Sequence, residues 1–243
     1  MKYAVKTNIG KRAHNEDSFL APKGETPPLL FAVADGMGGH AAGAVASGLV
    51  VEKLGAEDVV FSGDRELEQL KAAVERANLA VFEASEEDHS LRGMGTTLVA
   101  ALVLGKNYLA ANVGDSRMHH FNGETLERVT IDHSLVEQLV LSGLITREEA
   151  RFHPRRNIIT RAVGLSPAVD IDVFEREWNA GDLLLLCSDG LHGALEESEI
   201  SGVLASERSL EEMCDVLVQS ALENGGTDNI TLILARCEEG DLV

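Results

Sequence analysis

The stretch Leu29-Leu30-Phe31-Ala32-Val33-Ala34-Asp35-Gly36 decides the fold class, because six apolar residues run without a break into an Asp-Gly pair. A short apolar run that is bounded by turn residues predicts a buried strand. The same ending recurs where Leu183-Leu184-Leu185-Leu186-Cys187-Ser188 leads into Asp189-Gly190. The chain is therefore expected to contain buried strands that end in aspartate.

Other apolar runs extend this strand pattern along the chain. Three further buried strands are predicted at residues 98–104, 108–113 and 230–235. The turns Gly105-Lys106-Asn107 and Asn122-Gly123 separate neighbouring strands, which predicts consecutive antiparallel hairpins. Residues 169–173 alternate between apolar and acidic side chains, as is typical of a half-buried strand.

Helices are predicted between the strands. Apolar residues recur at helical spacing in one amphipathic helix, at Leu67, Leu70, Val74, Ala77 and Val81. Capping-box patterns mark three more helix starts, at Ser134 with Glu137, Thr146 with Glu149 and Ser209 with Glu212. The pattern predicts an α+β fold over residues 1–243, with antiparallel sheets inside and helices outside, as one domain.

The composition is that of an ordinary globular protein, with 44% apolar and 25% charged residues. The formal net charge of −19 disfavours nucleic acid and anionic membranes as partners. No run approaches about 18 uninterrupted apolar residues, and no apolar signal segment is present, so a cytoplasmic location is expected. The three cysteines form no C-x-x-C pair and are expected to be reduced.

Aspartates stand at the ends of several apolar runs. Asp35 and Asp189 end two strands, whereas Asp228 precedes another, so that all three can share one edge of an antiparallel sheet. A single Asp-Gly pair is more often a simple turn. Gathered carboxylates, however, repel one another unless cations neutralise them. Oxygen ligands favour Mg²⁺ or Mn²⁺ over zinc, and Gly36 would let its carbonyl approach a metal.

A charged segment near the N-terminus, Gly10-Lys11-Arg12-Ala13-His14-Asn15-Glu16-Asp17-Ser18, places Arg12 before two acids. The planar guanidinium of arginine suits the oxygens of a phosphate, and acids beside it can orient metal-bound waters. By itself the segment is also compatible with a plain surface cluster. Together with the aspartates it predicts a clamp for a phosphate group.

Seven motifs occur in order along nearly the whole chain: Arg12 to Asp17, Ala34-Asp35-Gly36-Met37-Gly38-Gly39-His40, Gly95-Thr96-Thr97, Asn112-Val113-Gly114-Asp115-Ser116-Arg117, Asp132-His133-Ser134, Ser188-Asp189-Gly190 and Gly226-Thr227-Asp228-Asn229. In this order they resemble the bacterial branch of the type 2C (PPM family) metal-dependent serine/threonine protein phosphatases. The resemblance implies a central β sandwich flanked by pairs of antiparallel helices. It also implies hydrolysis of phosphoserine and phosphothreonine by in-line attack of a water that bridges two metal ions.

The same resemblance implies a metal-binding role for five residues. Asp35 would bridge both ions, and Gly36 would give its carbonyl to one of them. Asp189 and Asp228 would hold the other ion. Asp115, together with Asp189, matches the position at which bacterial members bind a third metal ion.

Further roles concern the substrate and the proton. Arg12 matches the phosphate-binding arginine of the family, and Glu16 and Asp17 would anchor waters. Many eukaryotic relatives carry histidine directly after the Asp-Gly pair as a proposed acid for the leaving group, but Met37 stands here. His40 is one candidate for this acid, and a metal-bound water is the other.

A flap beside the active site of the family corresponds to residues 140–168. Five arginines form a basic island in and around this segment, Arg147, Arg151, Arg155, Arg156 and Arg161. Substrate docking is one interpretation of the island, and salt bridging to acids such as Glu148 and Glu149 is the other. The resemblance also implies a cognate bacterial Ser/Thr kinase as a partner.

Other hydrolase mechanisms lack their motifs. None of the three cysteines begins a C-x₅-R motif, and neither G-x-S-x-G nor a P-loop occurs. Two alternatives stay open beside the protein phosphatase. One is a phosphopeptide-binding regulatory module without catalysis, and the other is a metal phosphohydrolase that acts on small phosphate esters.

Overall fold

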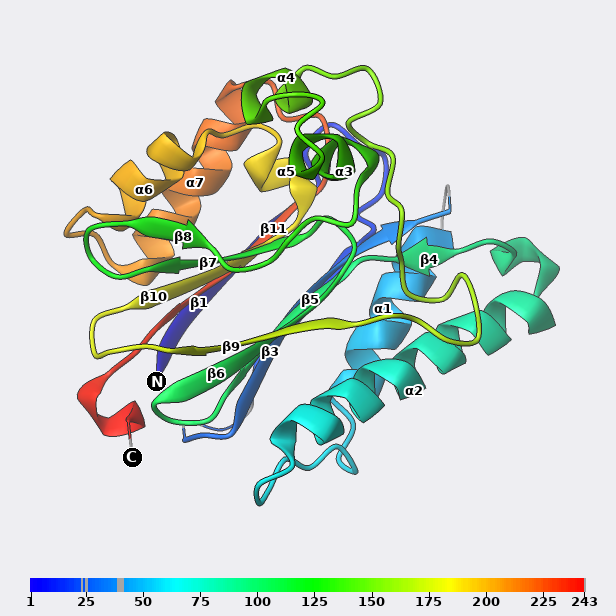
Figure 1. Ribbon diagram of the computed structural model, residues 1–243, viewed down its shortest axis with the longest axis horizontal. Coiled ribbons are helices and arrows are strands. Elements are labelled where there is room, and N and C mark those ends of the chain that lie inside the picture. Colours follow the sequence, from blue (N-terminus) through cyan, green and yellow to red (C-terminus); the bar gives the residue numbers. More distant parts are fainter. Residues whose placement is uncertain (23, 25, 39–41, 243) are drawn as a thin grey trace.

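The computed structural model describes residues 1–22, 24, 26–38 and 42–242. Two antiparallel sheets pack face to face, and helices cover the outer face of each sheet (Figure 1). The predicted fold, an antiparallel sandwich flanked by helix pairs, is therefore confirmed.

The first sheet contains the first and the last strand of the chain. Its strands lie in the order β1 (Lys2–Asn8), β11 (Ile230–Arg236), β10 (Leu183–Cys187), β7 (Arg117–Phe121) and β8 (Leu126–Arg128). The register sets Cys187 opposite Leu232, so that the end of β10 adjoins the beginning of β11.

The second sheet contains the apolar run at residues 29–34. Its order is β2 (Asp17–Leu20), β3 (Leu29–Met37), β5 (Leu98–Val103), β6 (Asn107–Val113) and β9 (Asp172–Glu177), and the short β4 (Gly95–Thr96) pairs with the end of β3. In β3, Phe31 and Val33 face the space between the sheets, whereas Leu30 and Ala32 face the helices. Because both faces are covered, the strand is apolar at every position.

Helices form the two outer layers. On the second sheet lie α1 (Ala42–Leu54) and α2 (Glu66–Glu87), and on the first lie α6 (Glu197–Leu204) and α7 (Leu210–Glu223) (Figure 1). The shorter helices are α3 (Leu135–Leu141), α4 (Arg147–Arg151), α5 (Asp189–His192), η1 (His89–Leu91) and η2 (Glu239–Asp241). Among the described residues, no helix has the length and apolarity that crossing a bilayer requires.

The strand predicted at 169–173 begins later than expected. β9 starts at Asp172, which pairs with Asn112 near the end of β6, and β6 ends one residue later at Val113. Val169 and Ile171 still pack against the core between the second sheet and its helices. The alternating pattern at residues 169–173 therefore reflects burial and not strand pairing over its whole length. Residues 169–171 pair with no described strand, because β6 ends at Val113.

The helix starts agree with the predicted caps, with one exception. Both halves of the capping box are present before α4 and α7. At α3, the Ser134 side chain accepts a hydrogen bond from the Glu137 amide, but the Glu137 carboxylate binds Arg128 at 2.7 Å. The predicted box is wrong there, because the largely buried Arg128 side chain, 10% exposed, binds that carboxylate in place of the backbone amide.

Candidate active site

A cleft of about 680 Å³ opens at one end of the sandwich, where strands of both sheets end. Its walls include residues from 12 to 16 and from 157 to 162, and its floor carries aspartates. The predicted residues that line it are Arg12, Glu16, Asp35, Gly36, Asp115, Asp189 and Asp228. The structure thus brings together side chains that are scattered along the sequence.

Two sheets supply the aspartates of the cleft. In the second sheet, β2 and β3 pair antiparallel so that Asp17 lies directly opposite Asp35. In the first sheet, Asp189 follows β10 and Asp228 precedes its neighbour β11. The strand-end argument therefore holds for Asp189 and Asp228 within one sheet, whereas Asp35 faces them from the other sheet.

Burial, and then the charges of neighbouring carboxylates, raise the pKa values of several of these aspartates. Burial, and then the charge of Asp189, raises the pKa of Asp35 well above its ordinary value. Burial likewise raises the pKa of Asp17 to about 7, of Asp115 to about 8 and of Asp189 to about 6. Negative charge is thus unfavourable in this cluster unless positive charge enters the cleft.

The oxygen donors of the cluster fit hard divalent cations. In the described part of the chain, no three His, Cys, Asp or Glu side chains converge as a complete ligand set. Mg²⁺ in particular is usually held by one or two carboxylates and keeps several waters, and Mn²⁺ also prefers oxygen ligands. Oδ1 of Asp17 is buried without a hydrogen-bond partner, which fits an acceptor that faces a water.

Gly36 lies in a backbone contact that excludes a side chain. A Cβ at this position would overlap the carbonyl oxygen of Gly43 in α1 and lie 2.6 Å from the carbonyl oxygen of Glu16. The Gly36 amide also donates to that Glu16 carbonyl at 3.0 Å. The strand end, the helix start and the residue 12–16 loop are therefore fixed against one another beside the cleft.

Threonines of the Gly95-Thr96-Thr97 motif hold the backbone of Asp35. The Asp35 amide donates to Oγ1 of Thr97 at 3.0 Å, and Oγ1 of Thr96 donates to the Asp35 carbonyl at 2.9 Å. The sequence marked this motif but assigned it no role. The structure gives it one, since these bonds fix the direction in which the Asp35 carboxylate leaves the strand.

Arg12 reaches the cluster from the N-terminal loop. Its Nη2 lies 2.6 Å from Oδ2 of Asp228, and 56% of its side chain is exposed to solvent. Bonding to Asp228 and the charge of that carboxylate raise the pKa of Arg12. The guanidinium is therefore anchored on one side and open to the cleft on the other.

Two further motif residues, Asn229 and Ser188, support the site in ways that the sequence did not predict. Asn229 donates to the carbonyls of Ile9 and His14 at 2.9 and 3.0 Å, and it accepts from the Glu16 amide at 2.8 Å. Ser188 donates to Oδ2 of Asp17 at 2.8 Å. Both belong to motifs that the sequence analysis quoted, Ser188 to Ser188-Asp189-Gly190 and Asn229 to Gly226-Thr227-Asp228-Asn229, and this membership was the available signal.

Asp115 lines the cleft, with 7% of its surface exposed. Its backbone carbonyl accepts a hydrogen bond from Nε2 of His192 in α5 at 3.0 Å. The neighbouring Arg117 forms a bidentate pair with Asp132, with contacts of 2.7 to 3.1 Å. The turn that carries Asp115 is thus held by α5.

Met37 and His40 occupy the positions considered above for an acid that protonates the leaving group. Met37 lines the cleft and has no ionisable group. His40 lies outside the residues that the structure describes.

The basic island divides into bonded and unbonded arginines. Arg147 binds Glu137 at 3.3 Å, and Arg161, which lines the cleft, binds Asp172 at 2.6 Å. Arg155 and Arg156 are exposed and form no ion pair with any residue that the structure describes. Salt bridging to Glu148 or Glu149 is not observed among the described residues.

Comparisons with known proteins agree with this geometry. Residues 6–231 match the family described as protein phosphatase 2C. A serine/threonine phosphatase named stp from Listeria welshimeri is 41% identical over 239 residues, which cover 96% of this chain and 95% of the relative.

Solved structures have the same fold. The phosphatase Stp1 from Staphylococcus aureus superposes with a TM-score of 0.93 at 39% identity, covering 98% of this chain and 95% of that one. The catalytic domain of PstP, solved in complex with two manganese ions, gives a TM-score of 0.88 at 38% identity, with 98% of both chains covered. The chain therefore belongs to the protein phosphatase 2C family of metal-dependent serine/threonine phosphatases.

Proposed function

We propose that this phosphatase hydrolyses phosphoserine and phosphothreonine in proteins with two divalent cations, Mn²⁺ or Mg²⁺, held at the aspartates of the cleft. The observation that carries the proposal is the gathering of aspartates at one cleft, where burial and then neighbouring carboxylates raise the pKa values of Asp17, Asp35, Asp115 and Asp189, so that their charged forms need cations. Its biological partner would be a Ser/Thr kinase whose products it dephosphorylates.

Each residue of the cluster takes a distinct part in this proposal. Asp35 would contact both ions, the Gly36 carbonyl one of them, and Asp189 with Asp228 the other. The origin of Asp35 in one sheet and of the other two in the opposite sheet supports this division. When bound, the cations would lower the pKa of a water nucleophile and neutralise phosphate charge.

Three acids would complete the cation site. Asp115, with Asp189, would hold a third ion, since burial and the charge of Asp189 are the two largest causes of its raised pKa. Glu16 and Asp17 would anchor waters, which the unpartnered Oδ1 of Asp17 supports.

The substrate phosphate would lie against Arg12. Its guanidinium is anchored by Asp228 and still has free donors, which suits bidentate contact with two phosphate oxygens. The leaving group would take its proton from a water or from His40, because Met37 cannot supply one.

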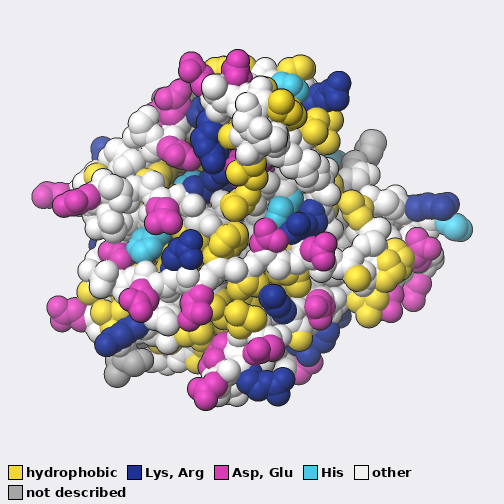
Figure 2. All heavy atoms as spheres, viewed as in Figure 1, with side chains coloured by type: hydrophobic (Ala, Val, Ile, Leu, Met, Phe, Trp, Pro, Cys, Tyr) yellow, Lys and Arg dark blue, Asp and Glu magenta, His cyan; other side chains and the backbone are white. Residues whose placement is uncertain are grey.

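Residues 140–168, which we propose act as a flap, offer a docking surface for the substrate polypeptide. Phe152 is 79% exposed and lies close in sequence to the unpaired Arg155 and Arg156. Hydrophobic and basic side chains lie side by side at the upper edge of the face in Figure 2, and residues 157–162 continue into the cleft. A phosphopeptide with acidic flanking residues would be favoured there.

Charge reversal tests this docking surface. Arg155→Glu with Arg156→Glu should raise KM for an acidic phosphothreonine peptide and leave turnover of p-nitrophenyl phosphate unchanged. Arg208→Glu is the matched control, because Arg208 is exposed and does not line the cleft. Equal peptide kinetics in all three proteins would remove the docking proposal.

Phosphate release from a phosphothreonine peptide tests the function itself. Activity should require Mn²⁺, disappear with a chelator and fall by orders of magnitude in Asp35→Asn. Faster turnover of sugar or nucleotide phosphates than of the peptide would favour the small-ester phosphohydrolase. Tight peptide binding without phosphate release would favour the regulatory module.

A further inference from the structure

His133 joins two walls of the cleft through three hydrogen bonds. Its amide donates to the Gly114 carbonyl at 2.8 Å, and its Nδ1 accepts from the Gly114 amide at 3.0 Å. Its own carbonyl accepts from the Thr160 amide at 2.8 Å. The side chain is 7% exposed, so water cannot readily replace these partners.

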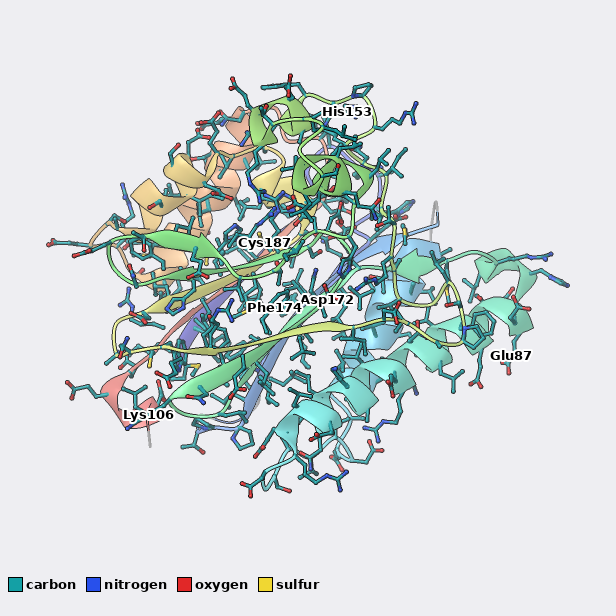
Figure 3. All side chains as sticks on the ribbon, in the orientation of Figure 1. Glu87, Lys106, His153, Asp172, Phe174 and Cys187 are labelled. Atoms are coloured by element: carbon teal, nitrogen blue, oxygen red, sulfur yellow. The ribbon has the colours of Figure 1, made fainter. Side chains whose placement is uncertain are left out.

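The far side of the same ring contacts an ion pair. Nε2 of His133 lies 3.1 Å from Oδ2 of Asp172 and 2.9 Å from Nη1 of Arg161. The same Nη1 donates to Oδ1 of Asp172 at 2.6 Å. Because the Gly114 amide can only donate, Nδ1 carries the lone pair and the ring proton resides on Nε2, where Asp172 and not the donor Arg161 can accept it. Asp172 is the first residue of β9 and lies at the centre of Figure 3.

The turn that His133 holds is the one that carries Asp115. Gly114 has a φ of +110°, and a side chain there would lie 2.6 Å from Cβ of Thr97. Beyond this glycine, the Asp115 carbonyl is bonded to His192. Hydrogen bonds from His192 to Asp115 and between His133 and Gly114 thus hold the turn from two sides.

We propose that His133 is a positioning residue that couples the Arg161–Asp172 pair on the cleft wall to the Gly114–Asp115 turn. The metal-affinity part of this proposal rests on the proposed role of Asp115 as a ligand of a third ion. The coupling itself rests only on the hydrogen bonds around the ring. A change at Asp172 is therefore transmitted to Gly114, although the two residues share no hydrogen bond.

Amide hydrogen exchange of the chelator-treated protein tests the coupling without metal. Asp172→Asn should speed exchange of the Gly114 amide about tenfold, because loss of one orienting hydrogen bond changes an equilibrium by roughly that factor. Asp170→Asn is the matched control, because its exposed carboxylate forms no ion pair with any described residue. Equal Gly114 exchange in Asp172→Asn and in this control would overturn the coupling.

A double-mutant cycle sharpens the test. His133→Asn puts a carbonyl oxygen near the position of Nδ1 and keeps the Gly114 bond, but it cannot reach Asp172. Adding Asp172→Asn to His133→Asn should then leave Gly114 exchange unchanged. If Asp172→Asn has the same effect with and without the histidine, the ring does not transmit it and the proposal is overturned.

Mn²⁺ titration by calorimetry tests the consequence for metal binding. His133→Gln keeps an amide donor near Nε2 but loses the Gly114 acceptor, so it should weaken the weakest Mn²⁺ site about tenfold and spare the others. Wild-type affinity at every site would overturn this consequence. If Asp115→Asn leaves Mn²⁺ stoichiometry unchanged, the third-ion proposal fails, while the exchange experiment still decides the coupling.

Discussion

Arg12 and Asp228 form an ion pair across 216 residues of sequence, with Nη2 2.6 Å from Oδ2. The pair joins the N-terminal loop to the start of β11, and both residues line the cleft. The Asp228 carboxylate thus orients Arg12, the proposed phosphate-binding residue, and also belongs to the proposed cation site.

Loss of the Arg12 guanidinium should weaken substrate binding. A charge-assisted hydrogen bond contributes about 1.5–3 kcal/mol, so Arg12→Ala should raise KM for a phosphothreonine peptide roughly 10- to 100-fold. Arg12→Lys should restore little of this loss, because lysine lacks the bidentate fork. Steady-state kinetics measure the effect, with the neighbouring Lys11→Ala as the control. A wild-type KM in Arg12→Ala would contradict the assignment.

Substitution of Asn229 should lower both the thermal stability of the protein and its affinity for substrate. Asn229→Ala removes three hydrogen bonds to the loop that carries Arg12, each contributing about 0.5–1.5 kcal/mol. The melting temperature should fall by several degrees, and KM should rise because the loop is no longer fixed. An unchanged KM in a protein with a lower melting temperature would show that Asn229 serves the fold alone.

Gly36 and Gly48 respond differently to the same substitution. Gly36→Ala forces a Cβ into the carbonyl of Gly43, so the strand end must shift and activity should fall at least tenfold. At Gly48 in α1, the nearest atom to a new Cβ is 4.0 Å away, and alanine should stabilise the helix by about 0.5–1 kcal/mol. Thermal melts and phosphatase assays on both variants test this contrast. Full activity in Gly36→Ala would contradict it.

The acid cluster predicts how stability depends on pH in the absence of metal. The pKa of Asp17 rises from 3.8 to about 7 and that of Asp115 to about 8 on folding, so the folded state keeps protons that the unfolded chain releases. The free energy of unfolding should therefore decrease as pH rises from about 4 to about 8. Mn²⁺ should oppose this loss by neutralising the carboxylates.

Thermal melts with a chelator and with Mn²⁺ measure this pH dependence. Asp17→Asn should make the chelator curve shallower, because one titrating group is gone. A melting temperature that rises with pH across the window in the chelator-treated protein would contradict the electrostatic account.

The sequence predicted the parts of the fold that depend on local pattern. The apolar run at residues 29–34 is continuous because β3 is covered on both faces, and α2 shows helical spacing because one face meets the core. The start of β9 was mispredicted because alternation reports burial and not the availability of a pairing partner. No pattern predicted α1, whose small side chains pack closely and leave little amphipathic signal.

The candidate site was predictable in its residue types but not in its supports. Aspartates at strand ends, read together with the family motifs, pointed to the residues that now line one cleft. Ser188, Asn229 and His133 act through hydrogen bonds to residues far away in sequence. Such bonds depend on how the two sheets face each other, which no local pattern encodes.

An anomalous difference map at the manganese absorption edge, from crystals grown with Mn²⁺, tests the central claim most directly. Two peaks should flank the Asp35 carboxylate, one beside the Gly36 carbonyl and the other between Asp189 and Asp228. A third, weaker peak should lie beside Asp115. Manganese peaks that avoid Asp35, or an absence of peaks in the cleft of an active crystal, would contradict the two-cation mechanism.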